Sequence, residues 1–153
     1  MSASARLAEL GLELPAVSAP AGAYVPALRV GNQVMTSGQI PFVNGELPVK
    51  GIVGKDVTPE QAADAARTCA LNALAAAASV AGGIDNIVSV VKVLGFVAST
   101  PDFGGQPSVV NGASNLLLDV FGDAGRHVRS AVGVAALPLN APVEVEIVVT
   151  VRD

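Results

Sequence analysis

The segment RSAVGVAALPLNAPVEVEIVVTV, near the C-terminus, contains residues that could bind an anion. It opens with Arg129 and holds no other charge before Glu144 and Glu146. An arginine in apolar surroundings is costly unless its guanidinium meets an anion. That anion is either one of the two glutamates, in a salt bridge that only orders a sheet, or the carboxylate of a small substrate. Spacing alone leaves both alternatives open, because structural ion pairs are common.

Arg129 is expected to have open space beside it. The alternation of a strand places Arg129, Ala131 and Gly133 on one face. The two small residues leave room next to the guanidinium, which suits a small planar carboxylate bound by two parallel hydrogen bonds. On the last strand, Glu144 and Glu146 share a face in the same way. We expect these two closing strands, residues 129–137 and 143–151, to lie side by side as a pair.

Four other residues could contact a ligand. Ser37 and Gly38 end a strand in TSGQIP, where Gly38 allows a ligand or another chain to approach closely, although such a dipeptide is more often only a turn. Tyr24, the only tyrosine, is either a packed ring or a donor of a hydrogen bond or proton. Asn111 could cap its helix or hold a backbone carbonyl.

Several other kinds of site are not supported. One histidine, His127, and one cysteine, Cys69, cannot supply the three or four ligands of a zinc site. Cys69 lies among alanines in a predicted helix and is expected to be a small core residue. His127 is expected in a loop near Arg126 and Arg129. No phosphate-binding glycine loop follows a strand, so we expect neither a metal nor an organic cofactor.

The elements that must position these residues begin with a short helix and a hairpin. Residues 4–12 predict a helix that ends at Gly11, because glycine suits a left-handed C-cap. Residues 23–42 predict two short strands around a turn at Gly31–Asn32. We assign residues 1–19 to an N-terminal helical extension and lead-in.

The clearest element is a helix that begins after Thr58. Thr58 can be its N-cap and Gln61 the capping-box partner, and an alanine-rich stretch then continues to Gly82. A long buried strand and a second helix follow, in NIVSVVKVLGFVAST and SVVNGASNLLLDVFG. In the strand we expect strict alternation of its faces, with Val88, Val90 and Lys92 on one side and Val91, Val93 and Gly95 on the other.

This order of elements predicts an α+β fold. With strands, a helix, a strand, a helix and two strands, the two main helices are expected to cover one face of a mixed sheet. The 153 residues suit a single domain, residues 1–153. No linker or repeat divides them.

Composition narrows the choice of partners. Only 14% of the residues are charged while 51% are hydrophobic, against about 25% charged in a usual soluble domain. Much apolar surface is therefore expected to enter a subunit interface. The net charge of −4 and the few aromatics oppose nucleic-acid binding. No apolar run reaches the roughly 18 residues of a membrane helix, and no signal peptide is apparent, so we expect a cytoplasmic protein without membrane partners.

Two stretches resemble the signatures of a known family. YVPALRVGNQVMTSGQIP and RSAVGVAALPLNAPVEVEIVV are similar to those of the YjgF/YER057c/UK114 group, also called the RidA or Rid family or endoribonuclease L-PSP. The second motif, Arg-Ser-x-Val followed by Leu-Pro and Val-Glu-Val-Glu, is the more specific. The resemblance extends from about Pro20 to the C-terminus, and the stretch GRHVRSAVG resembles one subgroup.

The resemblance implies a chorismate-mutase-like fold, homotrimers and ligand pockets between subunits. It implies hydrolysis of reactive enamines and imines, such as 2-aminoacrylate, to 2-keto acids and ammonia. The family's carboxylate-binding arginine falls on Arg129 and its water-positioning glutamate on Glu144. Its pocket tyrosine, strand-end Ser-Gly and helix asparagine fall on Tyr24, Ser37, Gly38 and Asn111, and Ala131 stands where a cysteine is common.

The chain also departs from the family in its second helix. There NGASNLLLDVF replaces the usual Asn-x-x-Tyr and pair of aromatics, in a helix that walls the family's pocket. Two other functions therefore stay open beside imine hydrolysis. One is a regulatory protein that binds a small carboxylate such as a 2-keto acid without turnover, and the other is a chorismate-mutase-type enzyme with an Arg–Glu site. A ribonuclease is the least favoured, because the acidic charge opposes it.

Overall fold

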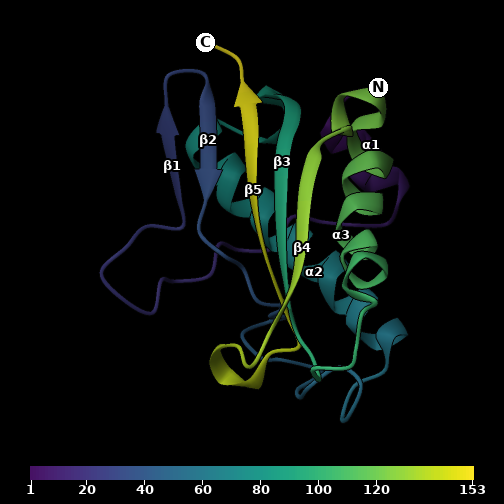
Figure 1. Ribbon diagram of the computed structural model, residues 1–153. Coiled ribbons are helices and arrows are strands. Elements are labelled where there is room, and N and C mark those ends of the chain that lie inside the picture. Colours follow the sequence, from purple (N-terminus) through teal and green to yellow (C-terminus); the bar gives the residue numbers. More distant parts are fainter.

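A five-stranded mixed sheet carries the fold (Figure 1). The computed structural model describes residues 1–153. The strand order is β1-β2-β5-β3-β4, and only the β3–β4 pair is parallel. The strands are β1 (Ala27–Val30), β2 (Gln33–Thr36), β3 (Ile87–Ala98), β4 (Val128–Val134) and β5 (Val143–Val151).

The two long helices cover one face of this sheet and leave the other bare (Figure 1). The predicted α+β fold with two main helices on one face is therefore confirmed. Three short 3-10 turns, η1 (Ile84–Asn86), η2 (Gly122–Gly125) and η3 (Pro138–Asn140), lie in the connections. The helices are α1 (Ala3–Glu9), α2 (Pro59–Ala81) and α3 (Gln106–Phe121).

The predicted start and end of α2 are confirmed. The Thr58 hydroxyl accepts from the Gln61 amide at 3.1 Å, and the Gln61 side chain accepts from the Thr58 amide at 3.0 Å. Gly82 ends the helix in the left-handed conformation. The alanines between them are almost all buried, because side chains this small let the helix lie close to the sheet.

The N-terminal helix is more than an extension. Gly11 follows it with a positive φ of 72°, as predicted. Ala3 and Leu7 are buried and belong to the same core cluster as the sheet and the long helices. The Ser4 hydroxyl and amide both donate to Asp85, and these hydrogen bonds lower the pKa of that carboxyl.

The strict alternation expected for β3 is wrong. The pairing of β3 with β5 shifts register between Ile87 and Ser89 and again between Val90 and Lys92. These irregularities put Val90 in the core, on the helix side with Val93, while Lys92 lies on the bare face. A β-bulge inserts an extra residue and so reverses the faces that follow it.

The expected pairing of the two closing strands is also wrong. β3 lies between them, paired with β4 on one side and with β5 on the other. β4 is therefore an edge strand. The chain leaves β3, passes through α3 and returns as β4, which runs parallel to β3. The sequences of the two closing strands do not indicate that β3 is the partner of both.

Two glycines let α3 settle against its neighbours. A Cβ at Gly112 would overlap the backbone carbonyl oxygen of Ala63 in α2, and a Cβ at Gly95 of β3 would lie 2.5 Å from a Val110 methyl of α3. Gly112 is thus a point at which the two long helices approach each other closely. Both contacts admit glycine and exclude any larger residue.

We expect Gly112→Ala to destabilise the protein by about 1–3 kcal/mol, the usual cost of overpacking a core. The gain of about 1 kcal/mol in helix propensity opposes this, but a backbone carbonyl cannot move cheaply. Gly104→Ala is the matched control, because nothing lies within 4 Å of its added methyl. Denaturant unfolding measures both, and equal stability of Gly112→Ala and wild type would contradict the packing argument.

Candidate functional site

The Arg129 guanidinium is held by neutral groups. Its Nη1 donates to Asn111 Oδ1 at 2.7 Å and to Ser114 Oγ at 3.2 Å. Its Nε and Nη2 donate to no group of the chain. The three ion pairs of the chain are Arg6–Glu9, Arg67–Asp119 and Arg126–Asp123. The alternative of an internal salt bridge between Arg129 and a glutamate is therefore wrong.

The residues that hold Arg129 lie on one face of α3. Asn111 and Ser114 are three positions apart, so their side chains are neighbours on the helix surface. Neither predicted role of Asn111 is found. It does not cap the helix, which begins five residues earlier, and its side chain holds Arg129 rather than a backbone carbonyl. Ser114 is buried and was not predicted as a site residue. Its spacing from Asn111 is the signal that could have identified it.

His127 also joins this group. Its Nε2 lies 2.9 Å from Ser114 Oγ, and its Nδ1 lies 2.6 Å from the Gly125 carbonyl oxygen. It immediately precedes β4, two residues before Arg129, so alternation brings both side chains to the helix-facing side. The prediction that His127 lies near Arg129 is confirmed, but its contacts were not foreseen.

Beside Arg129, Ala131 lies on the same side of β4 and packs partly against the core. It pairs with Gly95, and Arg129 pairs with the fully buried Val93. The predicted sharing of a face by Arg129, Ala131 and Gly133 is therefore confirmed. Arg129 itself is partly exposed.

Glu144 lies elsewhere, in a hollow of about 360 Å³. Tyr24, Gly38 and Gln39 line the same hollow. A Cβ at Gly38 would overlap the Glu144 carboxylate, with the Glu144 Cδ only 2.8 Å away, so this position admits only glycine while the carboxylate stays in place. The Gly38 amide donates to no group of the chain and is free for a ligand.

The Glu144 carboxyl has a raised pKa. Burial is the main cause, since desolvation disfavours the charged form, and the negative charge of Glu146 adds to it. Glu144 and Glu146 alternate along β5 with buried valines, as predicted, and both lie on the bare face. No cation of the chain pairs with Glu144. A half-buried carboxylate of this kind is a better base than an exposed one.

Tyr24 and Ser37 complete the rim of this region. Tyr24 is 51% exposed, and its hydroxyl oxygen accepts from the Ala21 amide at 3.3 Å, which leaves the phenol proton free to donate. It is not the packed core ring of the alternative interpretation. The Ser37 hydroxyl donates to the Val25 carbonyl at 2.6 Å, so its proton is already engaged. The role of Ser37 in binding stays a prediction.

The two groups of residues do not meet within one chain. Arg129 lies on the helix-covered side, as its bonds to α3 require. Glu144 pairs with Phe96 on the opposite, bare side. The cluster of Arg129, Asn111, Ser114 and His127 and the hollow of Glu144, Tyr24 and Gly38 are thus two separate half-sites.

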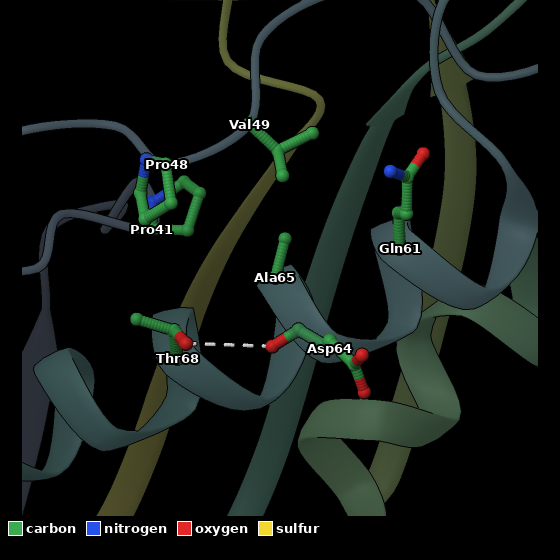
Figure 2. Close-up of a pocket in the computed structure, with 7 residues that line it drawn as sticks. All are labelled: Pro41, Pro48, Val49, Gln61, Asp64, Ala65 and Thr68. Atoms are coloured by element: carbon green, nitrogen blue, oxygen red, sulfur yellow. Dashed lines mark hydrogen bonds between the residues drawn. The ribbon is translucent and has the colours of Figure 1, made fainter.

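A second hollow lies between α2 and the loop that crosses it (Figure 2). It is smaller, about 170 Å³, and its only charged side chain is Asp64. Figure 2 shows the single hydrogen bond among its residues, from the Thr68 hydroxyl to the Asp64 backbone oxygen. It contains no cation that could bind the carboxylate of a substrate, so we do not place the chemistry here.

Cys69 is sealed in the core. It is fully buried on α2, and its thiol points to the Val143 carbonyl oxygen at 3.6 Å. Burial, with a smaller contribution from the Glu144 charge, raises the pKa of the thiol. The chain contains no cluster of three metal-ligating side chains. None of its helices combines the length and the apolar character needed to cross a bilayer.

Nearly the whole chain is similar to known proteins. Residues 4–150 match the family described as "YjgF/chorismate mutase-like, putative endoribonuclease". Protein TCP17 of Trypanosoma cruzi is 42% identical over 98% of this chain and 94% of its own. The crystal structure of Atu1372 from Agrobacterium tumefaciens shares 45% identity and a TM-score of 0.89, covering 98% of this chain and 92% of that one.

A third relative was solved with a ligand. Escherichia coli TdcF with bound serine shares 28% identity and a TM-score of 0.64. The match covers 90% of this chain and 94% of TdcF.

We expect Glu146→Gln to lower the pKa of Glu144, because it removes the neighbouring negative charge. The pKa should stay above the ordinary glutamate value, because desolvation, the larger cause, remains. An NMR pH titration of the Glu144 carboxyl carbon measures the shift. Glu13→Gln removes an exposed carboxyl that is not among the causes of the Glu144 shift, so this control should leave the Glu144 titration unchanged. No change in Glu146→Gln would show that the two charges do not interact.

Proposed function

This chain belongs to the YjgF/chorismate mutase-like family, and on that premise we propose that it hydrolyses reactive 2-imino acids to 2-keto acids and ammonia. The observation that carries the proposal is the Arg129 guanidinium. It is fixed by two neutral acceptors, has no carboxylate partner in the chain and keeps free N–H donors. Such a group is an open receptor for the carboxylate of a small substrate.

The proposed reaction needs little covalent chemistry from the protein. Protonation of the imine nitrogen makes C2 electrophilic. A water oxygen then bonds to C2 while a carboxylate takes the water proton, giving a carbinolamine. The carboxyl group returns that proton to the nitrogen. The C–N bond then breaks, ammonia leaves, and the hydroxyl gives its own proton to the carboxylate as it becomes the ketone. No electrons are transferred, so positioning and general base catalysis suffice, the latter contributing about 10²–10⁴-fold.

Glu144 is the proposed base. Its raised pKa brings its basicity closer to working pH than that of an exposed glutamate, and its place beside Gly38 and Tyr24 gives it donors for the rest of the substrate. The free Gly38 amide and the Tyr24 hydroxyl are proposed to hold the amine end or the attacking water. Asn111 and Ala131 are proposed to line the Arg129 side, and Ser37 to fix the loop that carries Gly38.

The two half-sites require a second copy of the chain. Since Arg129 and Glu144 lie on opposite faces of one sheet, one substrate can reach both only where two chains meet. The bare face of the sheet also exposes apolar side chains that another chain could bury. Leu28, Met35 and Val132 on this face are 57%, 40% and 42% exposed. Exposed apolar area of this kind marks an interaction surface. We infer a homotrimer with a shared cleft at each interface, as the family resemblance implies.

A second candidate is binding without turnover. TdcF was crystallised with bound serine, a small carboxylate that is not an imine. The same Arg129 receptor would then hold a 2-keto acid as a signal. Purified protein that binds 2-ketobutyrate but does not accelerate imine decay would favour this candidate over hydrolysis.

Arg129→Ala should abolish the acceleration of 2-iminobutanoate hydrolysis, because the carboxylate receptor is lost. The imine is made in situ by a dehydratase, and ketobutyrate or ammonia release is followed. Arg126→Ala is the matched control. Its side chain is 80% exposed and paired only with Asp123, so this variant should keep wild-type activity. An Arg129→Ala rate equal to that of wild type would overturn the assignment.

Mixing two inactive variants should restore part of the activity. Arg129→Ala chains keep Glu144, and Glu144→Gln chains keep Arg129, so some clefts of a mixed trimer are complete. Random assembly at equal amounts makes about one quarter of the clefts wild type. Chains are mixed by co-refolding, and their mass is checked by light scattering. Activity no higher than that of either variant alone, or a monomeric mass, would contradict the shared cleft.

A further inference from the structure

Gly125, His127, Ser114 and Arg129 are connected by consecutive hydrogen bonds. They extend from the Gly125 carbonyl through His127 and Ser114 to the guanidinium, with lengths of 2.6, 2.9 and 3.2 Å. Asn111 adds a second acceptor at 2.7 Å. The imine hydrolysis proposed above uses Arg129 but assigns no part to Ser114 or His127.

The Gly125 carbonyl determines the tautomer of His127. A carbonyl oxygen only accepts, so the 2.6 Å contact requires a proton on Nδ1. In the neutral imidazole, Nε2 is then an acceptor. The group 2.9 Å from it is the Ser114 hydroxyl, which must therefore be the donor.

The direction of the Ser114 hydroxyl follows from this. With its single proton on His127 Nε2, the serine oxygen turns its lone pairs to the other side, where Arg129 Nη1 lies at 3.2 Å. Ser114 is buried, so water does not compete for these lone pairs. A serine without the histidine could instead rotate its proton toward the guanidinium and lose the bond.

These bonds also determine which edge of Arg129 is free. Nη1 carries two protons, and Asn111 and Ser114 accept one each. The Nε proton and the two Nη2 protons stay free. Nε–H and one Nη2–H lie parallel along one edge of the planar guanidinium, which is the fork that binds a carboxylate side-on through both oxygens.

We propose that Ser114 and His127 are positioning residues for Arg129, which together aim the Nε/Nη2 edge of the guanidinium at the carboxylate of a 2-imino or 2-keto acid. The inference rests on the proposed function in that the ligand is a small carboxylate. Both acceptors of Nη1 are neutral, so they fix the arginine without neutralising its positive charge. That charge is then available for the ligand.

The first test does not depend on any activity. The chain has a single histidine, so its side-chain ¹⁵N NMR signals are unambiguous. In the neutral form we expect the proton on Nδ1 and a bare Nε2. In Ser114→Ala the Nε2 signal should shift, because its hydrogen bond is lost. A proton on Nε2 in the wild type, or no shift in the variant, would overturn the relay.

The second test separates positioning from mere support of the fold. Binding of 2-ketobutyrate is measured by calorimetry, and KM and kcat on 2-iminobutanoate are measured beside it. Ser114→Ala and His127→Leu should each weaken binding of 2-ketobutyrate about 10-fold and raise KM by a similar factor. A loss of this size is expected when one hydrogen bond to a charged group is lost. The kcat of each variant should stay within about twofold of the wild-type value. His127→Gln should recover most of the loss, because its amide oxygen can accept from Ser114.

Outcomes of these measurements distinguish the two proposals. Wild type that binds 2-ketobutyrate but does not hydrolyse the imine would remove the proposed function and leave the relay supported by the binding and NMR results. Unchanged binding in Ser114→Ala, or equal losses in His127→Gln and His127→Leu, would overturn the relay even if the enzyme is active. In an Arg129→Lys background, Ser114→Ala should add no further loss, because the serine acts only through the arginine.

Discussion

The close approach of α3 to α2 and to the sheet is the constraint on which the Arg129 cluster depends. Gly112 brings α3 onto the Ala63 carbonyl, and Gly95 admits Val110 from the same helix. Asn111 lies between these two contact residues and Ser114 follows two positions after Gly112, so the same packing places both beside Arg129 of β4. A helix displaced by one methyl group would move both acceptors of the guanidinium together, so packing and site geometry are not independent.

The same layer arrangement separates the charges of the two half-sites. One layer of helices leaves a sheet with a covered side and a bare side, and Arg129 and Glu144 fall on different sides. Within one chain they cannot neutralise each other. The guanidinium is thereby left without an internal carboxylate partner, and the partly buried carboxylate has a raised pKa. These are the two properties that the proposed hydrolysis of an imine would use.

Local sequence signals predict the individual helices and strands well. They do not predict how segments that are distant in the sequence pair with one another. The capping box at Thr58, the left-handed Gly11 and Gly82, and the alternation around Arg129 are all as the sequence indicates. The bulges of β3 and its place between β4 and β5 depend on pairing with distant strands, which no single strand encodes. The sequence does not predict the contact of His127 with Ser114 for the same reason, since Ser114 is 13 residues away on another element.

The burial of Cys69 has a consequence for the proposed imine chemistry. The C=N carbon of an imine is an electrophile, unlike the nucleophilic enamine, and the side chain that adds most readily to such a carbon is a thiolate. The one thiol of this chain is fully buried beneath β5, and its raised pKa keeps it protonated at neutral pH. Since Ala131, beside Arg129, also carries no nucleophile, the proposed substrate would meet no thiolate at the Arg129 cluster.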